Sequence, residues 1–306
     1  FIPTRTFITP GTENQSSSGG RVTVVRLSRQ GRRFIGHLVN DEELREAVRN
    51  PRTRTEAILD GVFSRGIVLV ESEGDREVYQ AASESIDDYP AREVHFVPVG
   101  GTGGFVAPLR FYSALRIPAA VIVDLDALVD SEKVADIAEA LTGASSDMHD
   151  LIEKQRDLAE GIRNQPPTFT ESDARERLEQ LSRQKLDWRN GDDNLLRRQL
   201  AELSGIVKRV RRLKEGGVSA YKDDPEIYSL LNEVVDGFAQ VGLFFVPVGQ
   251  LEDWVVQLMA DVPKRGTSKT DRAAIAADCI RAATDNSGDV WAFTRRVLDY
   301  LRAARK

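Results

Sequence analysis

The chain has 306 residues, 41% of them hydrophobic, which is enough to bury the core of one elaborated domain or of two. Its formal net charge of -6 argues against a protein that coats nucleic acid through bulk positive charge. A DNA enzyme is not excluded, because carboxylate-rich metal sites are acidic until their cations bind. The single cysteine, Cys279, rules out a disulfide framework and a multi-cysteine zinc site.

The N-terminal segment predicts a linker. The chain opens at Phe1, and residues 1–20 end in a Ser/Gly run, so we expect these residues to join a missing N-terminal domain to the rest. No signal-peptide pattern is present, and no apolar run approaches the ~20 residues needed to span a bilayer. We therefore expect a cytoplasmic protein without membrane contacts.

The next segments predict a β-hairpin and then an α/β domain. RVTVVRL and RRFIGHLV are short β-rich runs separated by SRQG, and helical spacing follows in DEELREAV and TRTEAILDGVF. From Gly66 onward, strands alternate with helices. The expected strands are residues 66–72, 94–100 and 119–126, and the expected helices are residues 75–85, 105–115 and one starting near Ser131.

Continuous apolar runs such as IVLV and AVIV are typical of a parallel sheet that is covered on both faces. Ligands gather at the carboxyl ends of the strands in such sheets. We expect residues 21–146 to form the first part of this domain.

Residues 147–241 change to long, charged, leucine-punctuated helices, which predict an inserted helical hairpin or bundle. One stretch is strongly basic and is typical of a solvated helix face, although it could also contact DNA phosphates. It comprises Lys208, Arg209, Arg211, Arg212 and Lys214. The α/β pattern then resumes in residues 242–306, with the strand LFFVPVG, the segment QLEDWVVQLM and two closing helices.

Two pairs of acidic residues stand where predicted strands end. Glu71 ends IVLV, and Asp75 follows it in the first helical turn, with Gly74 between them allowing a tight turn. Asp124 and Asp126 form the sequence DLD directly after AVIV. Acids at helix N-termini and strand-end turns are common for structural reasons alone, so a capping role is the alternative for both pairs.

Burying several carboxylates together is costly unless a positive charge neutralises them. Oxygen ligands without His or Cys partners suit Mg²⁺ or Mn²⁺ rather than zinc. Between the two pairs lies VPVGGTGGF, whose backbone N–H groups could bind a phosphate, although a plain tight turn explains it equally well.

VLVESEGD, VPVGG and VIVDLDAL, in this order and each with its strand, resemble the TOPRIM domain. The resemblance is closest to the C-terminal nuclease region of the OLD (overcoming lysogenization defect) family of ATP-dependent endonucleases. It covers nearly all of residues 21–306. It implies an α/β fold of TOPRIM type, which is a Rossmann-like parallel sheet flanked by helices, with an inserted helical domain.

The resemblance also assigns site residues. Glu71 with Asp75, and Asp124 with Asp126, match the two metal-binding pairs of the family. The later segment FFVPVGQLEDW adds Glu252 as a ligand, and the family's lysine falls on Lys269 or, as the second choice, Lys264. Two positions depart from the family: Ser72 replaces a glycine, and Gln250 replaces a frequent acid, which puts a ligand at residue 250 in doubt.

The implied function is hydrolysis of DNA phosphodiester bonds with two Mg²⁺ or Mn²⁺ ions. The implied partners are DNA and the N-terminal ATPase domain of the full-length chain, through which alone ATP would act, and a homodimer could form through the parent protein. Two alternatives are a non-catalytic DNA-binding or assembly module and a phosphatase of the haloacid dehalogenase type. The latter leaves Glu71 and Asp75 unexplained and has Leu128 where Thr or Val is usual.

Overall fold

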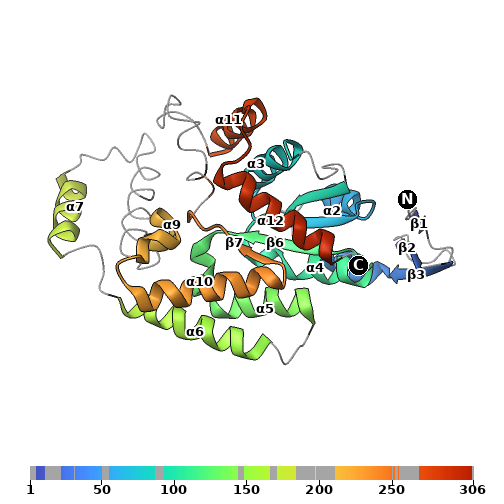
Figure 1. Ribbon diagram of the computed structural model, residues 1–306, viewed down its shortest axis with the longest axis horizontal. Coiled ribbons are helices and arrows are strands. Elements are labelled where there is room, and N and C mark those ends of the chain that lie inside the picture. Colours follow the sequence, from blue (N-terminus) through green and yellow to red (C-terminus); the bar gives the residue numbers. More distant parts are fainter. Residues whose placement is uncertain are drawn as a thin grey trace.

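The computed structural model contains a central parallel sheet between two layers of helices and a smaller antiparallel sheet at one end (Figure 1). It describes residues 5–10, 22–30, 32–49, 55–86, 93–143, 148–165, 171–183, 197, 211–249, 251, 254 and 269–304. The chain therefore has the α/β fold that the alternation of strands and helices predicts.

The central sheet has the strand order β5-β4-β6-β7, and every neighbouring pair is parallel. Its strands are β4 (Gly66–Val70), β5 (Val94–Pro98), β6 (Ala119–Val123) and β7 (Leu243–Phe245). The register pairs Leu69 of β4 with Val121 of β6. Because β4 and β6 are neighbours and run in the same direction, the residues that follow each of them meet at one edge of the sheet.

Both faces of this sheet are buried, because alternate side chains of each strand enter different cores. Ile67 and Leu69 belong to one core, and Val68 and Val70 belong to the other. The first core is covered by α1 (Asp41–Ala47), α2 (Thr55–Gly61), α4 (Val106–Ala114), α5 (Ser131–Thr142), α6 (Met148–Asn164) and α10 (Pro225–Gln240). The second is covered by α3 (Glu73–Glu84), α11 (Lys269–Ala282) and α12 (Asp289–Ala303).

Stability should depend strongly on the strand interiors. Leu69 lies in β4 and is fully buried, so Leu69→Ala should lower the free energy of unfolding by about 2–5 kcal/mol. Leu178 lies on α7 (Glu171–Arg183) and is 51% exposed, so the same substitution there should change it by less than about 0.5 kcal/mol. Urea unfolding followed by circular dichroism measures both, and equal losses would contradict this assignment of the core.

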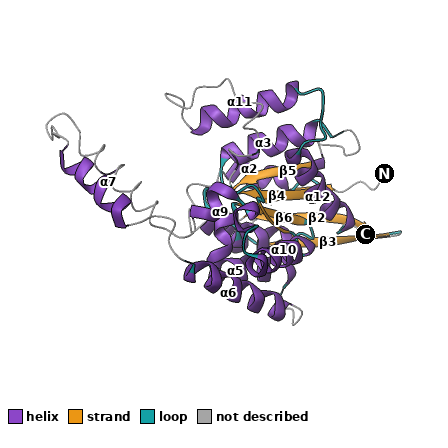
Figure 2. Ribbon diagram, turned by 60° about the vertical axis from the view of Figure 1, so that its left-hand side comes forward, coloured by secondary structure: helices purple, strands orange, loops and turns teal. Residues whose placement is uncertain are grey.

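The helices of residues 147–241 do not all stand apart from the sheet. Leu158 and Ile162 of α6 are buried in the same core as β4, and α10 packs along α6 (Figure 1). Fully buried Gln155 of α6 donates hydrogen bonds to the carbonyl of Leu128 and to the hydroxyl of Ser131, 3.0 Å away in the latter case. Of the described helices in this region, α7 is the one that extends away from the body in both views (Figures 1 and 2). The insertion is therefore partly integrated into the α/β core.

The smaller sheet has the order β1-β2-β3, with β1 (Arg5–Pro10), β2 (Val22–Gln30) and β3 (Arg33–Val39). The antiparallel pairing of β2 and β3 confirms the predicted hairpin. Strand β1 lies within the segment for which composition predicts a linker, and it pairs antiparallel with β2. The strand pattern RTFITP is short and is followed by a long Ser/Gly-rich stretch, so composition obscured it.

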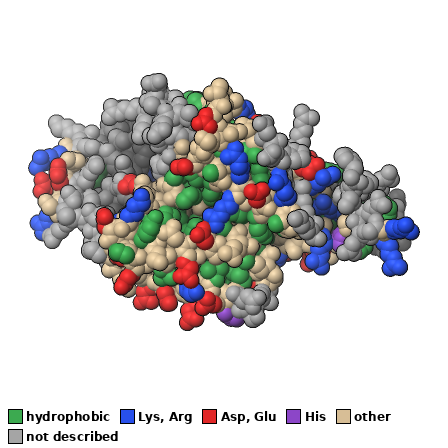
Figure 3. All heavy atoms as spheres, in the orientation of Figure 1, with side chains coloured by type: hydrophobic (Ala, Val, Ile, Leu, Met, Phe, Trp, Pro, Cys, Tyr) green, Lys and Arg blue, Asp and Glu red, His purple; other side chains and the backbone are tan. Residues whose placement is uncertain are grey.

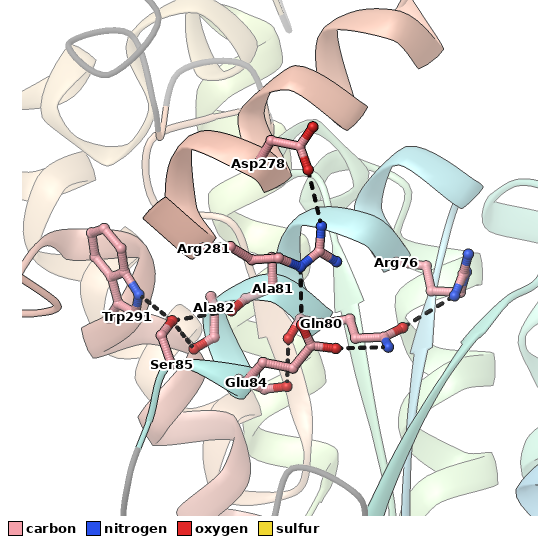
Figure 4. Close-up of polar contacts among 10 residues, drawn as sticks. Arg76, Gln80, Ala81, Ala82, Glu84, Ser85, Asp278, Arg281 and Trp291 are labelled. Carbon is pink, nitrogen blue, oxygen red and sulfur yellow. Dashed lines mark hydrogen bonds and ion pairs between the residues drawn. The ribbon is translucent and has the colours of Figure 1, made fainter. Parts of the chain in front are cut away.

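Helices α11 and α12 are fastened to α3 by polar contacts (Figure 4). Arg281 of α11 donates a hydrogen bond to Glu84 of α3 at 3.0 Å, and the indole N–H of Trp291 donates one to Ser85 at 2.9 Å. Trp291 is 5% exposed, so it is a core residue. None of the helices in the described part of the chain is long and apolar enough to cross a membrane.

Candidate metal centre at the ends of two parallel strands

Glu71 and Asp124 meet where β4 and β6 end. Each follows its strand directly, and the backbone N–H of Asp124 donates a hydrogen bond to Oε1 of Glu71 at 3.3 Å. Both side chains are largely withdrawn from solvent, and that of Asp124 is 25% exposed. The structure thus brings these two predicted site residues, which are far apart along the chain, to the same edge of the sheet.

Asp126 lies one step farther, in the first turn of the short 3-10 helix η3 (Leu125–Val129). A lysine from the inserted region, Lys214 of α9 (Arg211–Gly216), places its Nζ 3.9 Å from Oδ2 of Asp124 and 3.9 Å from Oδ2 of Asp126. The DLD sequence therefore holds two carboxylates near a single ammonium group.

Asp75 occupies the third position of α3 and takes part in its N-terminal cap. Its Oδ2 accepts hydrogen bonds from the backbone N–H of Ser72 at 2.9 Å and from the Ser72 hydroxyl at 2.7 Å. The capping role that the sequence left open is therefore present. The charge of Asp75 also raises the pKa of both Glu71 and Asp124, which places it in the same electrostatic environment.

Burial makes the carboxylates at this edge difficult to ionise. It is the main cause that raises the pKa of Glu71 to about 7, with the charges of Asp75 and Asp126 adding to the effect. Burial likewise raises the pKa of Asp124 to about 8, and the charge of Glu71 is the next cause. Lys214 lowers the pKa of both groups but does not offset the burial. A bound cation would favour the ionised form of these carboxylates and would lower their pKa values.

The donor set at this edge fits a hard divalent cation, because it consists of carboxylate oxygens. Within the residues that the structure describes, no three His, Cys, Asp or Glu side chains are arranged closely enough to form a metal-binding group. Two predicted residues, Glu252 and Lys264, lie outside the described residues. Lys269 is the first residue of α11, and its side chain is likewise outside them. The described acids at this edge therefore do not form a complete metal-binding group by themselves.

The backbone near Lys269 does approach this region. Helix α11 packs against α3, and a Cβ built on Gly74 of α3 would lie 2.9 Å from the Cβ of Ala273. Gly74 precedes Asp75, and Ala273 is one helical turn after Lys269. The glycine between the two acids therefore serves helix packing, and the N-terminal part of α11 lies close to the first turn of α3.

The glycine-rich loop after β5 forms a tight turn beside Glu71. The backbone N–H of Gly101 donates to the carbonyl of Glu71 at 2.9 Å, and that of Gly104 donates to Gly101 at 3.0 Å. Gly101 has φ of 119°, a conformation that favours glycine. Because these two N–H groups have backbone partners, the loop supports the turn interpretation rather than the phosphate interpretation.

Two aromatic residues, Tyr79 of α3 and Trp254, are in contact with each other near Asp75. Tyr79 is fully buried, and the indole N–H of Trp254 donates a hydrogen bond to its hydroxyl at 3.1 Å. Burial, and then the charge of Asp75, raise the pKa of Tyr79. Trp254 also packs on Phe293, with ring centroids 5.2 Å apart, which agrees with a core role. The sequence signal for Tyr79 is its spacing of four residues from Asp75 on one helix.

The comparison with known families identifies the domain. Residues 62–126, a range that contains Glu71, Asp75, Asp124 and Asp126, match the family described as "Overcoming lysogenization defect protein-like, TOPRIM domain". Together with the parallel sheet, this match makes the region a TOPRIM domain. More particularly, the matched residues are similar to the OLD-like form of this domain.

Solved structures provide more distant similarities. The C-terminal region of the Xanthomonas campestris pv. campestris OLD protein is 18% identical, with a TM-score of 0.35, and the match covers 79% of this chain and 97% of that one. The C-terminal region of the Burkholderia pseudomallei OLD protein is also 18% identical, with a TM-score of 0.34, covering 80% and 100% of the two chains. No curated protein gives a significant match. The similarity to the OLD-like TOPRIM family extends over residues 62–126.

Proposed function

We propose that this chain is a Mg²⁺- or Mn²⁺-dependent DNA nuclease that hydrolyses phosphodiester bonds with two metal ions. The observation that supports the proposal best is the contact between Glu71 and Asp124 at the ends of β4 and β6. Two partly buried acids follow neighbouring strand ends, and burial together with neighbouring acidic charges raises the pKa of both, so the protein alone does not neutralise them. A structural ion pair between Lys214 and Asp124 would not require Glu71 beside them.

Four described acids would hold the ions, namely Glu71, Asp75, Asp124 and Asp126, and Glu252 is proposed as a fifth ligand. When bound, the ions would supply an activated water and neutralise charge on the phosphodiester. The strand ends fix Glu71 and Asp124 in place, and the cap of α3 holds one oxygen of Asp75. Lys269, at the start of α11, is proposed to stabilise negative charge on the reacting phosphate.

The face shown in Figure 3 supports local rather than bulk attraction of DNA. Figure 3 shows basic and acidic side chains interspersed on the face it displays, with acidic side chains gathered along its lower edge. DNA binding would then depend on bound cations and a few placed basic residues. By the same proposal, the chain works within a longer protein whose N-terminal ATPase domain supplies the response to ATP and a possible homodimer contact.

Cleavage assays test the proposal. The purified chain should nick or degrade plasmid DNA with Mg²⁺ or Mn²⁺, and a chelator should stop the reaction. Asp126→Ala should lower the rate by more than about 100-fold. Asp299→Ala is the matched control, because Asp299 is a 68% exposed acid on α12 and its loss should leave the rate unchanged.

Two other outcomes would replace this function with its alternatives. Hydrolysis of a small phosphomonoester without any DNA cleavage would favour a phosphatase. Metal-independent DNA retention, with neither activity, would favour a binding or assembly module. Either result would contradict the nuclease proposal.

A further inference from the structure

Lys214 occupies an unusual position between the helical insertion and the acidic site. Its Nζ is equidistant, at 3.9 Å, from one oxygen of Asp124 and one of Asp126. This separation exceeds the 2.7–3.2 Å of a hydrogen bond, so the lysine neutralises the pair at long range without hydrogen-bonding to either of these oxygens. Its side chain is 39% exposed, which leaves the ammonium group accessible from solvent.

Backbone contacts between the α9 region and the loop after β7 fix the position of Lys214. The N–H of Val218, two residues after α9 ends, donates to the carbonyl of Pro247 at 2.8 Å. This hydrogen bond joins the segment that follows α9 to the loop after β7. The same loop holds the DLD sequence, because the N–H of Leu125 donates to Gly249 at 3.1 Å. A Cβ on Gly249 would lie 2.3 Å from the carbonyl oxygen of Lys214, so the two backbones are in direct contact.

The chemistry of this arrangement suits a phosphate. A lysine ammonium is a compact charge with three donors, and it binds phosphate oxygens well. A phosphodiester brought to cations on Asp124 and Asp126 would arrive within reach of Nζ, because Nζ lies equally near both carboxylates. Lys208 and Arg209 of the basic stretch lie outside the described residues, and Arg212 stacks on the ring of Tyr221, 4.6 Å from its centre.

We propose that Lys214 is a substrate-binding residue that contacts a DNA phosphate at the metal centre. The proposal rests on the proposed nuclease function and assigns one of its substrate contacts. It makes the inserted helices a part of the site, since the contact comes from α9. The contact is separate from that proposed for Lys269, which belongs to a different helix, α11.

The test compares Lys214→Met and Lys214→Arg with Lys154→Met. Lys154 is a matched control because it also bridges two carboxylates, Asp150 at 3.0 Å and Glu233 at 2.9 Å, but does so on α6 and α10. Binding of a fluorescein-labelled DNA duplex is measured by anisotropy with Ca²⁺ in place of Mg²⁺, across a series of KCl concentrations. Mn²⁺ binding to each variant is measured by calorimetry without DNA.

For Lys214→Met, the slope of log affinity against log salt should fall by about 0.9, which corresponds to one lost phosphate contact. Its Mn²⁺ affinity should stay the same or rise, because a positive charge near the ligands is removed. Cleavage should slow by about 100-fold, and Lys214→Arg should keep the salt slope. Lys154→Met should match the unmodified chain throughout.

An unchanged salt slope in Lys214→Met, or weaker Mn²⁺ binding, would overturn the proposal, since a purely structural counter-ion predicts the first and a metal-positioning role the second. Absence of DNA binding by the unmodified chain would overturn it as well. Failure of the nuclease proposal is a separate result, because it appears as DNA binding without metal-dependent cleavage while the salt slope still reports on Lys214.

Discussion

Asp124→Asn is expected to stabilise the metal-free protein while abolishing the proposed DNA cleavage. The folded state raises the pKa of Asp124 to about 8, mainly through burial, and the unfolded chain restores an ordinary value near 4. The folded state therefore binds this proton more tightly, and stability falls as pH rises from about 4 to about 8. Asparagine has a similar shape and no charge, so it removes this loss.

Thermal unfolding in a chelator measures the effect. At pH 8.5 the variant should be more stable than the unmodified chain by at least about 1 kcal/mol, and at pH 4 the two should be nearly equal. Mn²⁺ should raise the Tm of the unmodified chain and leave that of the variant almost unchanged. Metal-dependent DNA cleavage should fall by more than about 100-fold.

Asp299→Asn is the control, because this exposed acid should change stability by less than about 0.5 kcal/mol at either pH. If Asp124→Asn instead destabilised the chelated protein at pH 8.5, the carboxylate would be serving as a structural hydrogen-bond partner. The metal-centre proposal would then lose its electrostatic support.

The central sheet could be predicted from the sequence because its strands are continuous apolar runs. Val68 and Leu69 are both fully buried although they point to opposite faces, which is the signature of a sheet covered on both sides. The acids that follow two of these runs, Glu71 and Asp124, could be placed at one edge because parallel neighbouring strands end together. The apolar pattern of the strands and their parallel direction therefore predict where Glu71 and Asp124 lie.

The contributions of the helical insertion could not be read from sequence. Its charged composition suggests a solvated bundle, but Gln155 and Ile162 are fully buried against the α/β core. Lys214 appears within a run of basic residues, and nothing in that run distinguishes it from Arg212. What distinguishes it is a tertiary contact between α9 and the loop after β7, which depends on pairing across long sequence separations.

Asp75 shows why a single residue type supports two interpretations. An acid at the third position of a helix caps its N-terminus, and Asp75 does so through Ser72. The same position faces the strand ends, where its charge raises the pKa of Glu71. The capping contact fixes the orientation of the Asp75 carboxylate. It is therefore compatible with a proposed role as a metal ligand and also with a purely structural role as a helix cap.

Gly217→Ala should damage both the fold and the site through one backbone contact. Gly217 has φ of 59°, and a Cβ there would lie 2.2 Å from the carbonyl oxygen of Pro247 and 2.6 Å from the backbone of Val248. The side chain cannot be accommodated unless α9 moves away from the loop after β7. We expect a loss of about 2–5 kcal/mol in the free energy of unfolding, measured with urea.

Gly143→Ala separates backbone strain from this steric contact. Gly143 has φ of 72°, but a Cβ added there would have no atom within 4 Å, so alanine at this position should cost about 1–3 kcal/mol from backbone strain alone. Among molecules of Gly217→Ala that remain folded, the movement of α9 should withdraw Lys214 from Asp124 and Asp126. The salt dependence of DNA binding should then weaken as in Lys214→Met, whereas Gly143→Ala should retain it. Equal losses of stability in the two variants, with equal salt slopes, would show that the contact between α9 and the loop after β7 does not position the lysine.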